Sequence, residues 1–148
     1  QRSINKIKTT AQLANIVRNA IPKKKSKIDL ATKTFQAIRI YLNDEIKELE
    51  KGLIAAEKAL RPEGRLVVVS FHSIEDKIVK NFFYKCLQNT SLSRHLPELP
   101  KKNPSLEILT KKPILPSSKE IYINKRSRSA KLRIAKRTHF SSSFGEIA

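Results

Sequence analysis

Hydrophobic residues along this chain follow a helical period in three places. Between residues 32 and 60 they recur at spacings of three and four, which predicts one long helix with a single buried stripe. A shorter amphipathic helix is predicted before it, because Thr9 and Gln12 have the spacing of a capping box and Pro22 follows the last apolar position. Residues 74–88 repeat the same period, so one face of this third helix is expected to be buried.

A continuous apolar run at residues 66–69 interrupts the helical pattern. The run is mostly β-branched and follows a Pro-Glu-Gly segment, which is typical of a strand buried on both faces, as in a parallel sheet. Ser73 is predicted to cap the next helix, so the unit is a strand, a short polar turn and a helix. Ligands of open α/β sheets bind beyond the carboxyl ends of parallel strands, which makes the turn at 70–73 the first candidate site.

The C-terminal half predicts short elements joined by loops. Residues 89–104 carry three prolines without periodicity and are expected to form a loop, and residues 106–109 are expected to form a short strand. Ser117 and Glu120 have capping-box spacing and predict a turn of helix.

Residues 130–134 alternate apolar and charged side chains, which predicts a half-buried strand. In that strand the apolar side chains are expected to point inward and the cations Lys131 and Arg133 outward, with the pattern ending at residue 135. The segment 138–148 is expected to be a flexible tail.

A formal net charge of +18 indicates what kind of partner the protein binds. Such a charge favours a polyanion, nucleic acid first, over solubility alone. The acidic residues concentrate between Asp44 and Asp76, whereas beyond Lys77 only four glutamates interrupt the Lys and Arg residues. The C-terminal half is therefore the expected nucleic-acid-binding half.

The composition gives little support to a disulfide-rich, zinc-binding, membrane or secreted protein. Cys86 is the single cysteine and the three histidines are scattered, which disfavours a disulfide framework and a zinc site and makes Cys86 a packing residue. No apolar run approaches the roughly 20 residues of a membrane span, and no secretory signal is seen, so a cytoplasmic protein without a membrane partner is predicted.

Polar residues crowd the start of the long predicted helix. Such a helix end can hold an anion through its free backbone N–H groups, although capping and surface roles are equally open. The residues are Thr32, Lys33, Thr34, Gln36 and Arg39.

Three separated blocks of the chain resemble one family. They are residues 31–40 (ATKTFQAIRI), residues 64–76 (GRL running into SFHSIED) and residues 126–133 (RSRSAKLR). In these blocks the chain resembles the C-terminal portion of the ribosomal RNA small subunit methyltransferase H family, which methylates the exocyclic N4 of a cytidine in small-subunit ribosomal RNA. Among the departures, the family usually has a glycine where this chain has Glu63.

The resemblance implies an α/β fold, namely the C-terminal part of a Rossmann-like class I methyltransferase core preceded by the end of an inserted helical domain. Residues 1–28 would be the end of that inserted domain with a linker, and residues 29–137 the core part, whose last two strands would be antiparallel. Residues 138–148 would follow as the tail.

The cofactor implied by the resemblance is S-adenosyl-L-methionine, but the principal motifs that bind it have no counterpart here. A glycine-rich loop is absent, and the three glycines of the chain stand apart. No residue is therefore assigned to the cofactor, and the isolated chain is predicted to be inactive.

By resemblance, the turn at 70–73 would line the cytidine side of the active site. The catalytic candidates are His72, as proton acceptor or packed on the base, and Ser70 and Ser73, as hydrogen-bonding groups. Phe71 is a second candidate for packing on the base. Plainer roles stay open: Ser73 as a helix cap, His72 as a structural histidine and Phe71 as a core residue.

Eight residues are expected to contact RNA. Guanidinium groups match phosphate geometry, and clustered cations give salt-dependent affinity for RNA, although a solubilising tail is the alternative for the C-terminal four. The eight are Thr32, Lys33, Gln36, Arg39, Arg126, Arg128, Lys131 and Arg133.

The implied partner is small-subunit ribosomal RNA or the small ribosomal subunit, with a homodimer as a further option. Two rival functions remain open at this stage. One is a non-catalytic basic RNA-binding module, and the other is a ribosome-associated structural protein. The missing cofactor motifs favour the rivals, and the strand, turn and helix around His72 favour an enzyme.

Overall fold

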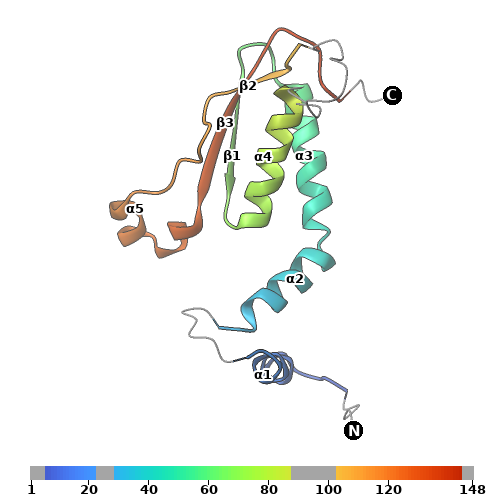
Figure 1. Ribbon diagram of the computed structural model, residues 1–148, viewed down its shortest axis with the longest axis vertical. Helices are drawn as coiled ribbons and strands as arrows, with labels where there is room; N and C mark the ends of the chain where they lie inside the picture. The colour runs from blue at the N-terminus through green and yellow to red at the C-terminus, as the bar shows by residue number, and fades with distance from the viewer. Residues whose placement is uncertain (1–5, 23–28, 88–102, 145–148) are drawn as a thin grey trace, which may run out of the picture. The chain divides into compact units, whose positions relative to one another are not determined.

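The computed structural model describes residues 6–22, 29–87 and 103–144 and divides the chain into two compact units, residues 1–45 and 46–148. The first unit contains two helices, α1 (Thr10–Ala20) and α2 (Thr32–Leu42). The elements that follow are α3 (Glu45–Ala59), β1 (Arg65–Ser70), α4 (Ser73–Leu87), β2 (Leu106–Ile108), α5 (Ser118–Ile123), the 3-10 helix η1 (Lys125–Ser129) and β3 (Lys131–Arg137). Figure 1 shows this order along the chain.

The capping box predicted at the first helix is confirmed. The Thr9 hydroxyl accepts a hydrogen bond from the Gln12 backbone N–H at 3.2 Å, and the Gln12 side chain accepts one from the Thr9 N–H at 3.2 Å. Each bond satisfies a backbone donor that has no partner inside the helix. The helix therefore begins where the sequence places it.

The single helix predicted over residues 32–60 is wrong, because the chain breaks between α2 and α3. Asp44 has a φ of 50°, in the left-handed region that ends a right-handed helix. Asparagine and aspartate enter this region more readily than other non-glycine residues, and Asn43 directly precedes the break. The apolar stripe does not register the break, since Leu42 and Ile46 keep a spacing of four across it.

The sheet of the second unit has the strand order β1-β3-β2, and both pairings are antiparallel. The antiparallel pairing expected for the last two strands is thus confirmed. A strand buried on both faces is not observed at residues 66–69, because α3 and α4 pack on one face only and Val67 and Val69 on the other face are 52% and 49% exposed. Among the described residues, β1 is an edge strand of this sheet.

The alternation predicted for β3 exists, but its direction is the reverse of the expected one. Arg133, Ala135 and Arg137 are buried on the face that α4 covers, whereas Leu132 and Ile134 are only half-buried on the open face. The strand also continues past residue 135 to Arg137. Alternation identifies two faces of a strand but not which one is covered, and here buried carboxylates beneath the helices accept the arginines.

The core of this unit lies between the helices and the covered face of the sheet. Its buried side chains come from α3, α4, β2 and β3, and they are Leu53, Val79, Phe82, Phe83, Cys86, Leu106 and Ala135. Cys86 is fully buried, as predicted for a packing residue, and its burial raises the pKa of the thiol to about 12.

The described part of the predicted tail packs on this core. The Phe144 ring stacks on Phe82 at 5.2 Å between centroids, and the Ser142 hydroxyl donates to the buried Glu57 carboxylate. Arg137 donates to the carbonyls of Ser105 and Phe140 at 2.8 Å and 2.7 Å. Residues 138–144 therefore close one end of the second unit.

The turn before β1 contains a residue in the left-handed region. Glu63 has a φ of 68°, a conformation that glycine adopts without steric cost and at which the family resemblance places a glycine. At the next position a Cβ atom on Gly64 would meet the Arg61 carbonyl oxygen at 2.8 Å, so only glycine fits there.

The remaining segments contain a predicted strand, a predicted helix cap and a predicted loop. The predicted strand at 106–109 is observed as β2, and Ser117 caps α5 by accepting the Glu120 N–H at 3.1 Å. The predicted loop at 89–104 lies almost wholly outside the described residues. Within the described ranges, no helix is long and apolar enough to cross a membrane.

Candidate functional site

The turn between β1 and α4 is held by a reciprocal capping arrangement. His72 precedes the first helical residue, and its Nδ1 accepts a hydrogen bond from the Glu75 backbone N–H at 3.3 Å. The Glu75 carboxylate accepts in return from the backbone N–H groups of Phe71 at 2.9 Å and of His72 at 3.3 Å. This is the geometry of a capping box with histidine in the place of serine or threonine.

The hydrogen bond at Nδ1 determines how the imidazole is used. A neutral ring that accepts at Nδ1 carries its proton on Nε2, and Nε2 lies 3.1 Å from Glu75 Oε1, at an angle too poor for a hydrogen bond. Both ring nitrogens therefore face Glu75, which supports the structural role left open for His72. A role in proton transfer stays a prediction.

The two serines of the turn lie in different surroundings. Ser70 is the last residue of β1 and is buried, with its hydroxyl 3.4 Å from the Lys131 carbonyl oxygen. Ser73 is exposed and is the first residue of α4, so the predicted cap at Ser73 is wrong and His72 takes that place. Alternation along the strand places the side chains of Ser70 and Phe71 on opposite faces. The capping contact with Glu75 keeps the His72 ring largely away from solvent.

We expect His72→Ala to lower the free energy of unfolding by about 1 kcal/mol, because the cap at α4 is lost. His72→Asn should retain most of the stability, since an asparagine side chain also accepts at a helix N-terminus. Urea unfolding of the two variants measures the difference. Equal destabilisation by both substitutions would contradict a capping role for the ring.

Asp76 lies one residue further into α4 and pairs with two cations of β3. Its carboxylate oxygens are 2.7 Å and 3.2 Å from Nε and Nη2 of Arg133, and Lys131 Nζ lies 3.3 Å from Oδ2. The Arg133 hydrogen bond, followed by its charge, holds the pKa of Asp76 below its usual value. Arg133 is 6% exposed, so the expected outward position of Arg133 is wrong.

The cations of the C-terminal block thus fall into two groups. Those of β3 are paired with carboxylates: Lys131 and Arg133 with Asp76, and Lys136 with Glu63 and Glu107. Those of η1 are exposed, and among the described residues none of them has a carboxylate within ion-pair distance. The η1 group consists of Lys125, Arg126 and Arg128.

The exposed cations are presented by a tight 3-10 turn. Asn124 caps η1 by accepting the Arg126 N–H at 3.1 Å, and Ala130 N–H donates to the Ser127 carbonyl at 2.8 Å. Ser127 is buried and its hydroxyl donates to the Asn124 carbonyl at 2.8 Å. This inward serine leaves its two arginine neighbours on the surface.

An open pocket of about 370 Å³ lies between this turn and the end of β1. Its lining residues are Phe71, Lys125, Arg126, Arg128 and Ser129. Phe71 is 56% exposed, so the core position considered for it is wrong. The pocket is therefore lined by one aromatic residue, three cationic residues and a serine.

The other predicted RNA contacts belong to the first unit. Thr32 and Lys33 are exposed in the first turn of α2, Gln36 is half-buried, and Arg39 pairs with Glu45 at 2.8 Å.

An anion site at the start of α2 conflicts with a carboxylate that is already there. Asp29 accepts the Ala31 N–H at 2.8 Å and pairs with Arg18, whose hydrogen bond lowers the pKa of Asp29. A second anion would meet the negative charge of Asp29 at this helix end.

The described residues do not fit an S-adenosylmethionine site. Gly52 lies inside α3 and Gly64 in the turn before β1, so neither opens a strand-to-helix loop. The short turn that joins β1 to α4 is held by the Glu75 carboxylate.

Three contributors to the site escaped prediction from sequence. Asp76 shares the buried stripe of α4 at spacings of three and four with Val79 and Phe83, and a carboxylate on such a stripe needs a cation. Lys125 and Ser129 flank the arginines of the RSRS block and complete the pocket, but only the 3-10 turn brings them there.

Comparison with known proteins gives concordant matches. The chain matches the MraW methylase family over residues 1–138. It is 50% identical over 137 residues to the ribosomal RNA small subunit methyltransferase H of Rhodopseudomonas palustris strain BisA53, covering 93% of this chain and 41% of the relative. With the protein of the same name from Rickettsia canadensis strain McKiel it shares 51% identity over 138 residues, covering 91% of this chain and 45% of the relative.

The chain thus spans about two fifths of the length of the curated relatives it matches. The resemblance drawn from the three sequence blocks is confirmed by these matches, which run through all three. The chain belongs to the MraW methylase family.

Proposed function

We propose that this chain is the C-terminal, RNA-facing portion of an S-adenosylmethionine-dependent methyltransferase that modifies the exocyclic N4 of a cytidine in small-subunit ribosomal RNA. Family membership over residues 1–138 carries the proposal. The relatives whose names state ribosomal RNA methyltransferase activity are more than twice as long as the matched region, so the remaining length would supply the cofactor site.

The open face of the sheet supports the proposal that a further layer of the protein covers it. Val67, Val69 and Ile114 are each about half exposed on or beside it, and β1 presents an unpaired edge within the described part of the chain. Sheets of Rossmann-like proteins are covered by helices on both faces. In the proposal, the remaining portion adds strands beyond β1 and helices over this face.

The geometry of the site also suggests which residues of this chain position the base and which contact the RNA backbone. Methyl transfer to an amine depends mainly on holding the nitrogen in line with the methyl group, so a rigid turn near the acceptor base contributes by positioning. The capped turn at 70–73 is such a turn, and Ser70, His72 and Ser73 remain its candidate side chains. For the RNA backbone we retain Arg126 and Arg128, since Lys131 and Arg133 are already paired with Asp76.

The partner in this proposal is the small ribosomal subunit or its RNA, in the cytoplasm, and a homodimer stays a prediction. The isolated chain is proposed to be inactive. A non-catalytic basic RNA-binding module is the second candidate, favoured by the unpaired cations of η1 and by the missing cofactor residues.

Nucleoside analysis of the product tests the reaction. Undermethylated small subunits would be incubated with S-adenosylmethionine, this chain and the remaining portion of a family relative, and the RNA digested for mass spectrometry. We expect a methylated cytidine that fragments to N4-methylcytosine. A methyl group on another base, or on the ribose, would overturn the cytidine-N4 assignment, and RNA binding without any transfer would favour the binding module.

A further inference from the structure

From the outer face of α4 we infer a separate binding surface, on which Lys77, Lys80 and Lys85 hold the phosphate backbone of an RNA duplex. The surface is distinct from the pocket at η1, because none of the three lysines lines that pocket. Nothing in the relatives' names assigns a role to this face. The inference rests on the proposed function only in taking RNA as the polyanion.

The first support is the position of the three lysines on the solvent side of α4. All three are exposed, whereas the other side of the helix is buried in the core through Val79, Phe82, Phe83 and Cys86. A helix rises about 1.5 Å per residue, so the lysines extend over about 12 Å from the first to the last. Each strand of a nucleic-acid duplex carries a charge about every 3 Å, so this length matches several phosphates.

The second support is that no carboxylate balances this face. After Asp76, α4 contains no acidic residue, and within the described ranges no carboxylate lies within ion-pair distance of the three lysines. By contrast, Lys51 of α3 pairs with Glu48 at 2.8 Å, and Lys136 of β3 pairs with Glu107 at 3.2 Å. The outer face of α4 therefore presents three positive charges that a polyanion can neutralise.

The third support is that the stability of the helix does not explain these lysines. Lys77 and Lys80 lie three positions apart, where like charges on a helix repel each other. Both precede the last turn, where the helix dipole favours a cation, and only Lys85 lies in that turn. Lys80 Nζ lies 5.8 Å from the centroid of the Tyr84 ring, a contact that keeps the lysine along the helix face. A bound polyanion relieves the repulsion between the lysines.

The composition of the face favours a duplex backbone over a lipid surface or an unpaired strand. Helices that bind membranes turn an apolar side toward the lipid, whereas the apolar side of α4 is buried in the core. Unpaired strands stack on aromatic side chains, and the one exposed ring of α4, Tyr84, already contacts Lys80. Double-stranded RNA is recognised mostly through its shape and backbone, for which lysines on a convex face are sufficient.

The salt dependence of duplex binding tests the inference. The probe is an RNA duplex of about 16 base pairs, and its affinity for the 148-residue chain is measured between about 50 and 200 mM salt. The test variant combines Lys77→Gln, Lys80→Gln and Lys85→Gln. It should bind at least about 10-fold more weakly, and its plot of log affinity against log salt should lose about 2–3 of its slope. Two duplexes of unrelated sequence should behave alike, because no base is read.

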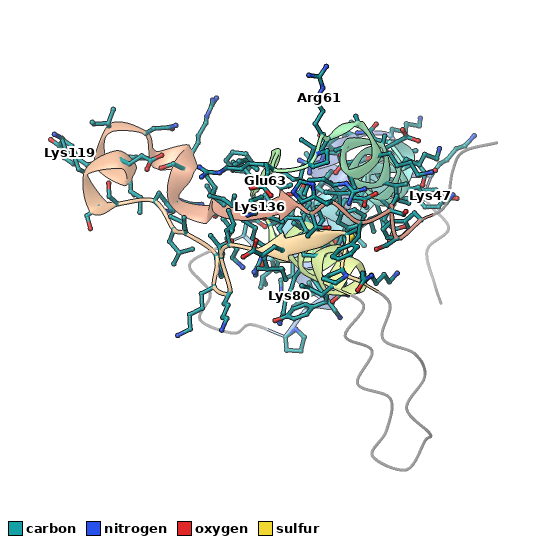
Figure 2. The ribbon with its side chains drawn as sticks, turned by 90° about the horizontal axis from the view of Figure 1, so that it is seen from above. Lys47, Arg61, Glu63, Lys80, Lys119 and Lys136 are labelled. Atoms are coloured by element: carbon teal, nitrogen blue, oxygen red, sulfur yellow. The ribbon has the colours of Figure 1, made fainter. Side chains whose placement is uncertain are left out.

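A control variant makes the same change of charge on another helix. It combines Lys47→Gln, Lys51→Gln and Lys58→Gln, all in α3, where glutamates accompany the lysines. Figure 2 shows Lys47 well apart from Lys80. We expect the control variant to lose less than about 1 of the slope. Urea unfolding of both variants should give the wild-type midpoint, since the exposed lysines of α4 make no described ion pair.

A second variant of α4 keeps the charge and changes the side chain. It combines Lys77→Arg, Lys80→Arg and Lys85→Arg, and it should retain the wild-type slope because the three positive charges remain. A loss of slope in this variant as large as in the glutamine variant would contradict phosphate binding by charge.

The inference is overturned if the glutamine variants of α3 and α4 lose the same slope, because net charge alone would then set the affinity. It is also overturned if the α4 glutamine variant binds the duplex like the wild type, or if it loses binding only to phosphatidylglycerol vesicles. These readouts use neither cofactor nor methyl transfer. Failure of this surface therefore leaves the proposed enzyme standing, and a failed methyl transfer with the slope difference intact leaves the surface standing.

Discussion

Asp76→Ala is expected to lower the free energy of unfolding by about 3–5 kcal/mol, because it leaves Arg133 charged and buried without a partner. The Asp76 and Arg133 side chains are only 13% and 8% exposed, and they are joined by two hydrogen bonds. A loss of this size is a large fraction of the roughly 5–15 kcal/mol that stabilises a typical domain. Urea unfolding would show the loss as a lower midpoint with an unchanged slope.

An ion pair on the surface serves as the control that separates the effect of burial from the effect of charge. Glu107→Gln removes a carboxylate that pairs with Lys136 at 3.2 Å but is 57% exposed, so we expect at most about 1 kcal/mol. Replacing both partners, in Asp76→Leu with Arg133→Met, should recover most of the stability because neither position then carries a buried charge. Similar effects of Asp76→Ala and Glu107→Gln would contradict a buried ion pair.

The pH dependence of stability follows from the same pair. The pKa of Asp76 is lowered in the folded chain, chiefly by the hydrogen bond from Arg133, so folding favours its ionised form. This contribution is present above the unfolded-state pKa of about 4 and is lost as the pH falls from there through the folded pKa. Asp76→Asn should remove that part of the acid sensitivity.

Val69→Asp is expected to reduce reconstituted methyl transfer by at least about 100-fold while changing the stability of the chain alone by only about 1 kcal/mol. Val69 is 49% exposed on the open sheet face, so a carboxylate there meets water in the isolated chain and costs little more than strand propensity. In the proposed function a remaining portion covers this face, and the charge would then be buried without a partner at a cost of several kcal/mol.

Val69→Thr is the control, because threonine keeps the β-branched shape and carries no charge. It should reduce transfer by far less than aspartate does. Radiolabel transfer and urea unfolding on the same preparations give both quantities. Full activity of Val69→Asp with the remaining portion would mean that the open face stays in water, and the proposed covering layer would be wrong.

The elements that rest on local chemistry were predictable from the sequence. The capping box at Thr9 and the cap at Ser117 require only side chains at the right spacing, and both are observed. The apolar run at 66–69 and the helical stripe after it indicated the strand, turn and helix that position the candidate site. The RSRS block of the sequence already identified two of the cationic residues that line the pocket.

What could not be predicted depends on which surfaces meet. The break at Asp44 leaves the apolar spacing intact, so periodicity alone reports one helix. The reversed face of β3 depends on Asp76, which lies 57 residues away from Arg133 in the sequence. Phe71 looks like a core residue until the sheet is seen to be covered on one face only.

Serine and histidine in the turn illustrate a further limit. A serine before an acidic first turn is an ordinary helix cap, and histidine is a familiar proton acceptor, so the sequence predicted Ser73 as the cap and left His72 open between a role in the chemistry and a structural role. The structure instead uses the histidine ring as the cap and leaves Ser73 exposed. A shift of one position in the helix start is enough to move the cap from one residue to its neighbour.

The measurement to make first is transfer of a labelled methyl group from S-adenosylmethionine to undermethylated small ribosomal subunits. It would compare this chain alone, the remaining portion of a family relative alone, and the two together. We expect label in the ribosomal RNA only with both parts present, since the cofactor residues and the RNA-facing residues would then lie in different parts. Transfer by this chain alone, or none with both parts present and shown to associate, would contradict the proposed division of the enzyme.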